Sequence, residues 1–549
     1  MPLAPEGHSS DQITQCEDAI CRSPPEKPTY PVNSTVGYLS GPRLLAILTG
    51  VTLAAFIMLL DMTIIVTAIP RITDDFNSLP DLGWYGSAYT VSSAALQPMT
   101  GKLYSHLGIK WTFLAFIAVF EVGSLVCGLA SSSPVFIVGR AIAGLGSSGI
   151  MNGALTIVAA SVPLTRRPAV TGIVLGIAYM GSVAGPLIGG ALTEYSTWRW
   201  CFYINLPIGG VTCAALLFTA IPDHGQKVSH AGHLLSHLDL PGFFLFAPAV
   251  AMILLGLQYG GNRYAWSSPR VIGLLCGGLA TGIVFAAWEG WRKEKAMMPL
   301  SLLSKRAVWS SVLVGGFMTS TLLVHSYYLP IYFQAVKGAS PTMSGVYLLP
   351  SILSQLLSSA FFGAIVGKLG YCIPAVLLSG VMVAIGGGLL SLLTVSTPTA
   401  KWIGYQVLLG FGRGVGIQMP FIAVQAVLGS HLVPESMSLI VFAQTFGGSI
   451  FLTVANVIFN NQLRTLLEQN VPGVPADRVI GAGATAFRSV VPEQDLESVL
   501  RVYSRALSAV FYLSAALACV YLGLSWGMGW TDIRKKGVAE EQADMDKGS

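Results

Sequence analysis

The feature that most constrains this chain is a series of apolar windows, each about 20 residues long, which recur from Leu44 to Trp530. A helix of that length crosses the roughly 30 Å hydrocarbon core of a bilayer. Lipid offers the backbone no hydrogen-bond partners, so each window is expected to be helical. Only 10% of the 549 residues are charged, against about 25% in soluble domains. We therefore predict an all-α polytopic membrane protein.

Fourteen windows can be counted, in groups of six, two and six. They cover residues 44–69, 84–104, 111–131, 135–160, 168–192, 200–220, 240–258, 270–290, 308–333, 343–366, 371–393, 402–428, 436–460 and 503–529. This pattern predicts two six-helix bundles, at 41–220 and 307–530, joined by a linker at 221–306 with two extra transmembrane helices. The string Gly101–Gly108 after the second window is echoed by Gly363–Gly370 after the second window of the last six, as expected for a parallel repeat.

Three polar segments flank or interrupt the windows. Residues 1–40 are rich in proline and are expected to form a disordered tail, and residues 531–549 form a second tail. The stretch 461–502 has mixed charge with Gly/Pro turns, so we expect a solvated outer loop, with a small amphipathic cap as the alternative. Lys and Arg in the short loops favour one orientation, in which both termini are cytoplasmic and the sequon at Asn33 is unused.

Charge and cysteine content exclude other classes. The net charge of +5 is small for the length and argues against nucleic-acid binding. Six of the eight cysteines lie in apolar runs, without a disulfide or zinc spacing. The linker histidines could ligate zinc, but a solvated linker helix is the preferred interpretation, so no metal site is predicted; the histidines are His224, His230, His233 and His237.

A glycine-rich run occupies the fifth window. Gly181, Gly185 and Gly189 recur every four residues and share one helix face. Such small-residue ridges let two helix backbones approach closely in a membrane. Pro186 cannot donate to the carbonyl of Ser182, so a bend is expected there.

The same run carries a family resemblance. The order Gly176, Gly181, Gly185, Pro186, Gly189, Gly190 resembles the antiporter signature in the fifth helix of major facilitator superfamily exporters, which implies proton-coupled efflux. The string from Trp198 to Pro207, WRWCFYINLP, resembles toxin-efflux members of the fourteen-span drug:proton antiporters, in particular fungal pumps for secondary metabolites. The resemblance covers the first half strongly and the second half weakly. In this superfamily the first half couples protons and the second half diverges with the substrate, so the resemblance indicates the family and leaves the substrate open.

Intramembrane charges are the candidates for proton coupling. Asp61 interrupts an apolar run, where a carboxylate costs several kcal/mol unless it is paired, hydrated or protonated. Its segment resembles the first-helix motif of the fourteen-span antiporters; the alternative is a structural aspartate bonded to a neighbouring helix. Arg140 resembles the fourth-helix arginine and must find a partner, either Asp61 or Glu121, unless it snorkels to the interface. Glu121 is the alternative proton site, and Arg413 is a candidate repeat partner of Arg140.

The loop after the second window resembles the cytoplasmic gate motif of the superfamily. Gly101, Lys102, Gly108 and Lys110 keep positions of that motif, and the glycines are expected to permit a tight turn. Ser105 and His106 replace the acidic residue and the first arginine. The usual charge relay is therefore not expected here.

The energy source is the remaining question. No GxxxxGK[ST] string occurs, which argues against an ATP-driven pump, and no catalytic constellation or cofactor motif stands out, so the chain is not expected to be an enzyme. We predict a monomeric antiporter, driven by the proton gradient, that exports a small amphipathic toxin, drug or secondary metabolite across the plasma membrane, or a vacuolar or vesicle membrane, by alternating access. Six polar or aromatic residues are expected to face the substrate cavity: Gln334, Gln418, Gln444, Tyr327, Tyr328 and Phe446. An uptake transporter of iron-chelate or amino-acid type and a non-transporting sensor are the alternatives.

Overall fold

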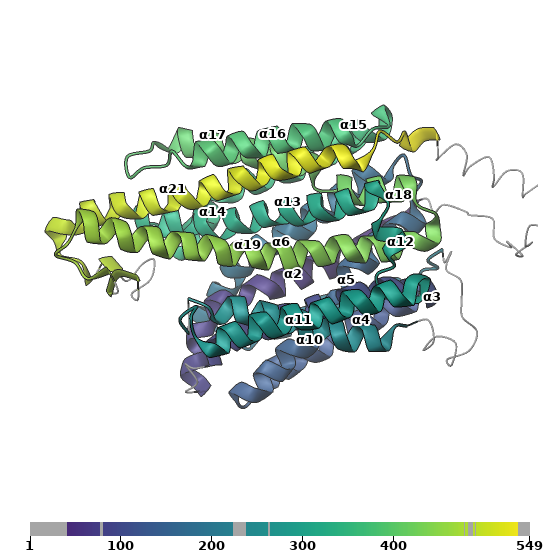
Figure 1. Ribbon diagram of the computed structural model, residues 1–549, viewed down its shortest axis with the longest axis horizontal. Helices are drawn as coiled ribbons and strands as arrows, with labels where there is room; N and C mark the ends of the chain where they lie inside the picture. Colours follow the sequence, from purple (N-terminus) through teal and green to yellow (C-terminus); the bar gives the residue numbers. More distant parts are fainter. Residues whose placement is uncertain are drawn as a thin grey trace, which may run out of the picture.

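The computed structural model describes residues 41–76, 81–222, 238–261, 264–476, 478–480, 487–488 and 490–535 (Figure 1). Regular structure in these ranges is helical, apart from one isolated bridge between Gly260 and Tyr264. The all-α prediction is confirmed. The expectations for residues 1–40, for Asn33 and for the four linker histidines fall outside the described residues.

Each predicted span coincides with a helix or a closely spaced pair of helices. The first six are α2 (Pro42–Phe76), α3 (Leu82–His106), α4 (Ile109–Leu129), α5 (Ser133–Ser161), α6 (Arg167–Tyr195) and the pair α7 (Trp200–Tyr203) and α8 (Asn205–Leu217). The linker contributes α10 (Leu240–Tyr259), α11 (Pro269–Arg292) and the short α12 (Leu300–Leu303). The last six are α13 (Arg306–Ile331), α14 (Pro341–Val346) with α15 (Leu349–Leu369), α16 (Ile373–Leu390), α17 (Thr399–Gly416) with α18 (Met419–Val427), α19 (Val433–Asn470) and α21 (Glu493–Leu524).

Thirteen spans among the described residues are long and apolar enough to cross a membrane. The second predicted span, α3, is not among them although it has 25 residues. Its sequence carries hydroxyl and amide side chains along its length, including Ser92, Ser93 and Gln97, which lower its mean hydropathy. Three of its polar side chains, Ser93, Gln97 and Thr100, are buried against the protein, so α3 faces neighbouring helices and needs less apolar surface.

The helices form two packed groups, which we call the N-terminal half (α2–α8) and the C-terminal half (α13–α21). In the first, α2 packs along α6 and α4 along α5; in the second, α15 packs on α17 and α13 on α19. The halves meet where α6 lies against α15 and α3 against α19. In Figure 1 the C-terminal half occupies the upper part of the view, and α10 and α11 lie in the lower part, where α10 packs on α3.

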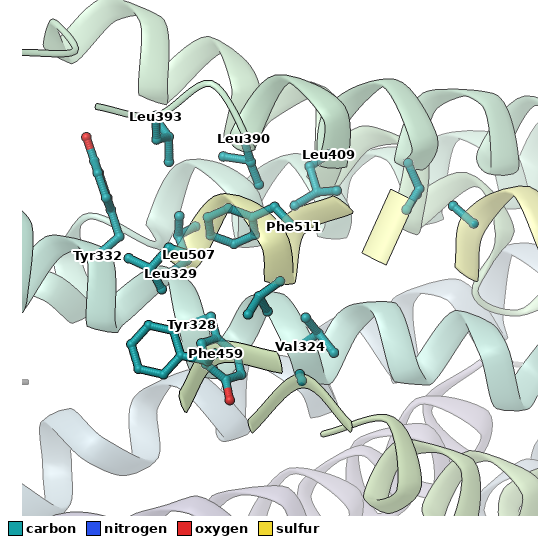
Figure 2. Close-up of a cluster of buried hydrophobic side chains, with 14 of the residues drawn as sticks. Val324, Tyr328, Leu329, Tyr332, Leu390, Leu393, Leu409, Phe459, Leu507 and Phe511 are labelled. Carbon is teal, nitrogen blue, oxygen red and sulfur yellow. The ribbon is translucent and has the colours of Figure 1, made fainter. Parts of the chain in front are cut away.

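The C-terminal half has an aromatic core. Figure 2 shows Tyr328 and Phe459 side by side, with ring centroids 5.6 Å apart, near buried leucines of α13, α16, α17 and α21. Burial of such rings contributes most of the packing energy of a core. This cluster extends to residues beyond the bilayer-length windows, including Leu467, Val471 and Phe487.

The expectation of a solvated loop at 461–502 is wrong. Helix α19 continues to Asn470 and α21 begins at Glu493, so much of that stretch is helix. The described residues between the two helices bury apolar side chains, and Phe487 stacks on Tyr503 with centroids 4.6 Å apart. The apolar residues interspersed among the charges explain the difference, since they bury against the core. The alternative of a small amphipathic cap agrees better with this packing.

Candidate functional site

The charged centre of the N-terminal half is an ion pair between α2 and α5. Asp61 is 0% and Arg140 1% exposed, and Arg140 Nη1 donates to Asp61 Oδ2 over 2.7 Å. Removing one partner of a buried ion pair leaves an uncompensated charge and typically costs about 3–5 kcal/mol. Of the two carboxylates predicted as partners of Arg140, the structure joins Asp61 to it.

A third helix completes the coordination of Asp61. Asn205, at the start of α8, donates from Nδ2 to Asp61 Oδ1 over 3.0 Å. The same amide nitrogen lies 3.1 Å from Ser124 Oγ of α4. Both carboxylate oxygens therefore accept a hydrogen bond. Asn205 was not predicted as a site residue. An amide side chain in the otherwise apolar string YINLP, residues 203–207, could have indicated a buried polar contact.

Arg140 has partners of its own apart from Asp61. Its Nε donates to the backbone oxygen of Tyr85 over 3.0 Å. Its guanidinium carbon lies 4.5 Å from the ring centroid of Tyr89 and 5.7 Å from that of Phe202, within the range of cation–π attraction. Tyr85 and Tyr89 belong to α3 and Phe202 to α7, so these contacts hold the guanidinium independently of the charge on Asp61.

Glu121 of α4 lies apart from this pair. Its carboxylate abuts α8 at Gly209, where a Cβ atom would overlap it. Among the described residues neither of its carboxylate oxygens has a hydrogen-bond partner. Within the part of the chain that the structure describes, one predicted carboxylate is thus fully paired and the other has no hydrogen bond.

The glycine face of α6 lies directly on α2, beside Asp61. A Cβ on Gly185 would lie 2.8 Å from Ile64 N, and one on Gly189 would lie 2.5 Å from Ile64 O. Gly181 meets the backbone of Phe56 in the same way. The predicted close approach of two backbones is confirmed.

The other motif positions differ in their surroundings. Gly176 faces α15, where a Cβ would lie 2.5 Å from Leu356 Cδ1, whereas a Cβ on Gly190 would meet no described atom within 4 Å. Pro186, where a bend is expected, lies inside α6, which runs on to Tyr195. Along its length, therefore, α6 contacts α2 in its own half and α15 in the other.

The gate segment differs from the sequence expectation. Gly101 lies within α3, which continues to His106, and Gly108 has φ −63°, so neither residue makes a turn that requires glycine. Gly101 instead allows close packing, because a Cβ there would lie 2.6 Å from Glu435 Cα of α19. Its role is an inter-half contact.

Basic gate residues bond to backbone oxygens. Lys102 Nζ donates to Lys295 O over 3.0 Å. Lys110 Nζ donates to Leu217 O and Thr219 O, each over 2.8 Å, where the carbonyls at a helix C-terminus attract a cation. Both lysines therefore fasten α3 and α4 to neighbouring segments.

Further bonds join the two halves at the end of the molecule that carries Lys102, Arg167 and Lys368, which we call the inner end. Ser105 Oγ donates to His431 O over 3.2 Å, and Ser359 Oγ to Gly172 O over 2.9 Å. Arg167 Nη1 donates to Gln425 Oε1 over 3.3 Å. These bonds, with the packing at Gly101, close the inner end in this conformation.

The six residues expected to face the substrate cavity do not come together. Gln444 lines a small cavity with Arg413 and Tyr521. Tyr328 is 4% exposed and belongs to the aromatic core, while Tyr327 is 42% exposed. The remaining three have other contacts: Gln418 donates to Ser359 O over 3.0 Å, Gln334 donates to Ser344 Oγ over 2.9 Å, and Phe446 stacks on Phe442 at 5.3 Å.

Comparison with known proteins relates this architecture to transporters. The family model described as Major Facilitator Superfamily matches residues 51–452. The MFS-type transporter pigP of Monascus ruber is 54% identical over 92% of this chain and 89% of its own length. The efflux pump mlcE of Penicillium citrinum is 49% identical over 91% of this chain and 92% of its own length. The solved structure of the proton:xylose symporter XylE shares the fold with a TM-score of 0.58 at 13% identity, covering 90% of this chain and 98% of that one.

Proposed function

Because the chain belongs to the Major Facilitator Superfamily, we propose that it is a proton-coupled antiporter that exports a small amphipathic secondary metabolite. Relatives named as efflux pumps, at 49% and 42% identity, support the direction of transport. The observation that carries the coupling mechanism is the buried Asp61–Arg140 pair. Asp61 is the proton site in this proposal, with Arg140 and Asn205 as its positioning residues.

Protonation of Asp61 changes the balance of forces at the pair. The ionised carboxylate accepts from Arg140 and Asn205, and each charge offsets the cost of burying the other. A proton on Asp61 removes the attraction, while Arg140 keeps the Tyr85 carbonyl and the Tyr89 ring. Helix α2 is then free to move relative to α5, so proton binding is linked to a change in helix packing.

The glycine face of α6 supplies the connection to the other half. Gly185 and Gly189 contribute no side chain of their own, so the α6 backbone lies directly against Thr63, Ile64 and Thr67 of α2. Such close-packed contacts have low compressibility and transmit strain. Since α6 also packs on α15, a movement of α2 displaces α6 and, through it, α15 of the C-terminal half. In this way the contacts between the halves at the inner end are made and broken.

The proposal also covers the membrane, the topology and the order of events in transport. The protein acts in the plasma membrane with both termini in the cytoplasm, as a monomer with two six-helix bundles at 41–220 and 307–530. Cargo enters when the inner end opens, and a proton from outside is exchanged for it. Glu121 is the second candidate for the proton, since its carboxylate also lies inside the span of α4.

Export is tested by cargo retention in cells. Cells lacking the protein should retain more of a candidate metabolite, and cells overproducing it should retain less. An Asp61→Asn variant at the same membrane level serves as the control and should behave like the deletion. Greater retention on overproduction would identify an uptake transporter instead.

A further inference from the structure

Arg413 of α17 is a second intramembrane arginine, and the mechanism above does not use it. Its residue is 6% exposed, yet Nε and Nη2 have no hydrogen-bond partner among the described residues. An arginine side chain cannot release its charge under physiological conditions. An unpaired buried charge is costly, so an anionic partner would stabilise this guanidinium.

The sequence around Arg413 offers no such partner. From Arg306 to Pro434, and again from Ser436 to Leu467, there is no aspartate or glutamate. The only carboxylate between these stretches, Glu435, lies in the first turn of α19 at the inner end. This contrasts with Arg140, which has Asp61. Among the described residues no ion pair joins Arg413 to a carboxylate, so the guanidinium is open to an anion from outside the chain.

The glycines that flank Arg413 determine where it points. Gly412 packs on Val383 of α16 and Gly414 on Gln355 and Ser358 of α15, each without room for a side chain. In the string GFGRGVG, residues 410–416, Arg413 is the only residue after Phe411 that has a long side chain. It lines two small cavities, of about 10 and 40 Å³.

The larger cavity lies between the halves and has further polar groups. Its wall includes Gly176 and Ser182 of α6, Gln355 of α15 and His325 of α13. His325 is 1% exposed, and its Nδ1 lies 2.7 Å from Thr321 O. Because a carbonyl oxygen only accepts, Nδ1 carries the hydrogen and Nε2, which has no partner in the described chain, is left as an acceptor. The smaller cavity adds the amide of Gln444.

We propose that Arg413 is the anion-binding subsite of the exporter and that its cargo is an organic acid, bearing a carboxylate or an ionised phenol or enol. This inference rests on the proposed export function and specifies its substrate class. Arginine donors form strong charge-assisted hydrogen bonds with such oxygens, and the amides of Gln355 and Gln444 line the same cavities as further donors. His325 Nε2, as an acceptor, takes a hydrogen from a hydroxyl group of the cargo and not from its anionic oxygen. The cavities have room only for groups about the size of water, so in the present conformation they accommodate the acidic head alone.

The test compares two probes of nearly equal shape on purified full-length protein in dodecyl maltoside. Tritiated 1-naphthoate carries the charge, and tritiated 1-naphthamide is its neutral counterpart. Wild type should bind naphthoate at least about tenfold more tightly, since hydrogen bonds to charged groups exceed the 1.4 kcal/mol that a factor of ten represents. Equal affinity for the two probes would overturn the proposal, and this comparison requires no variant to fold.

Variants assign the preference to Arg413. Arg413→Gln should lower naphthoate affinity to that of naphthamide while naphthamide binding stays unchanged, and Arg413→Lys should keep part of the preference. Lys401→Gln, at an exposed position of the same helix, is the matched control and should behave as wild type. A full preference for naphthoate in Arg413→Gln would also overturn the proposal.

Failure of the subsite and failure of the export function have different signatures. Naphthoate preference without any cargo-induced proton flux in wild-type vesicles would contradict the export function and leave the anion subsite standing. Proton-coupled export with equal affinity for both probes would contradict only the subsite.

Discussion

Asp61 is held from two sides, because each carboxylate oxygen accepts a hydrogen bond from a different helix. Arg140 balances its charge, and Asn205 fixes its orientation without adding charge. This division has a functional advantage: an amide can bond either to the ionised carboxylate or, through its oxygen, to the protonated acid. Asn205 Oδ1 has no partner among the described residues, so it is available to accept the proton-bearing hydroxyl.

Asn205→Leu tests this role. The change keeps similar volume and removes both amide functions, so Asp61 Oδ1 loses its donor. An unsatisfied buried acceptor costs about 1–3 kcal/mol, and the melting temperature in detergent should fall accordingly. Ser124→Ala removes the other contact of the same amide and should have a smaller effect, because a neutral hydroxyl is the weaker partner. An unchanged melting temperature in Asn205→Leu would show that Asp61 does not depend on the amide.

At the scale of helices, glycine provides the close contacts on which the moving parts depend. Gly185 and Gly190 lie in the same motif of α6, but only Gly185 touches α2. Gly185→Leu should insert into the membrane and fail to transport, since overpacking typically costs roughly 1–3 kcal/mol. Gly190→Leu should retain transport, as measured by cargo efflux at equal protein level. Normal efflux with Gly185→Leu would mean that the ridge does not carry the motion.

The contact between α3 and α19 gives a second test. Gly101→Leu should prevent closure of the inner end, because Gly101 sits against the Glu435 backbone. A cysteine at Ser105, a buried gate position, should then react faster with a membrane-impermeant thiol reagent in inside-out vesicles. Gly86→Leu on the same helix, where nothing lies within 4 Å, is the control. Equal labelling rates in the two variants would argue against this gate.

These elements also show what the sequence could and could not predict. Apolar windows located every span, because length and hydropathy are local properties. The four-residue glycine spacing predicted the face of α6 but not its partner α2, which depends on tertiary packing. Asn205 was missed for the same reason: its bond to Asp61 joins residues 144 positions apart. Tyr328 and Gln444 looked alike as cavity candidates, yet one belongs to the core and the other to the cavity wall.

For the whole molecule, the cavities beside Arg413 are small, about 10 and 40 Å³, and a larger one of about 310 Å³ lies at the inner end beside Lys102 and Glu435. Binding sites for drug-sized ligands measure about 300–1,000 Å³, so a whole cargo molecule reaches Arg413 only when the halves separate. The contacts that must break include close backbone packing at Gly101, buried apolar side chains from both halves, and hydrogen bonds such as Ser105 with His431 O and Ser359 with Gly172 O. Hydrogen bonds of this kind contribute about 1 kcal/mol each, which allows a ligand or proton to shift the equilibrium.

The central claim is that Asp61 couples proton movement to cargo movement, and proton flux in vesicles tests it most directly. Inside-out vesicles acidified inside should accumulate cargo and release protons when cargo is added, as reported by a pH-sensitive dye. Asp61→Asn keeps the shape and hydrogen-bonding capacity of a protonated aspartate, so it should still exchange cargo without a gradient. We predict no uphill accumulation and no cargo-induced proton release in this variant. Wild-type proton release in Asp61→Asn would contradict the account and transfer the coupling role to Glu121.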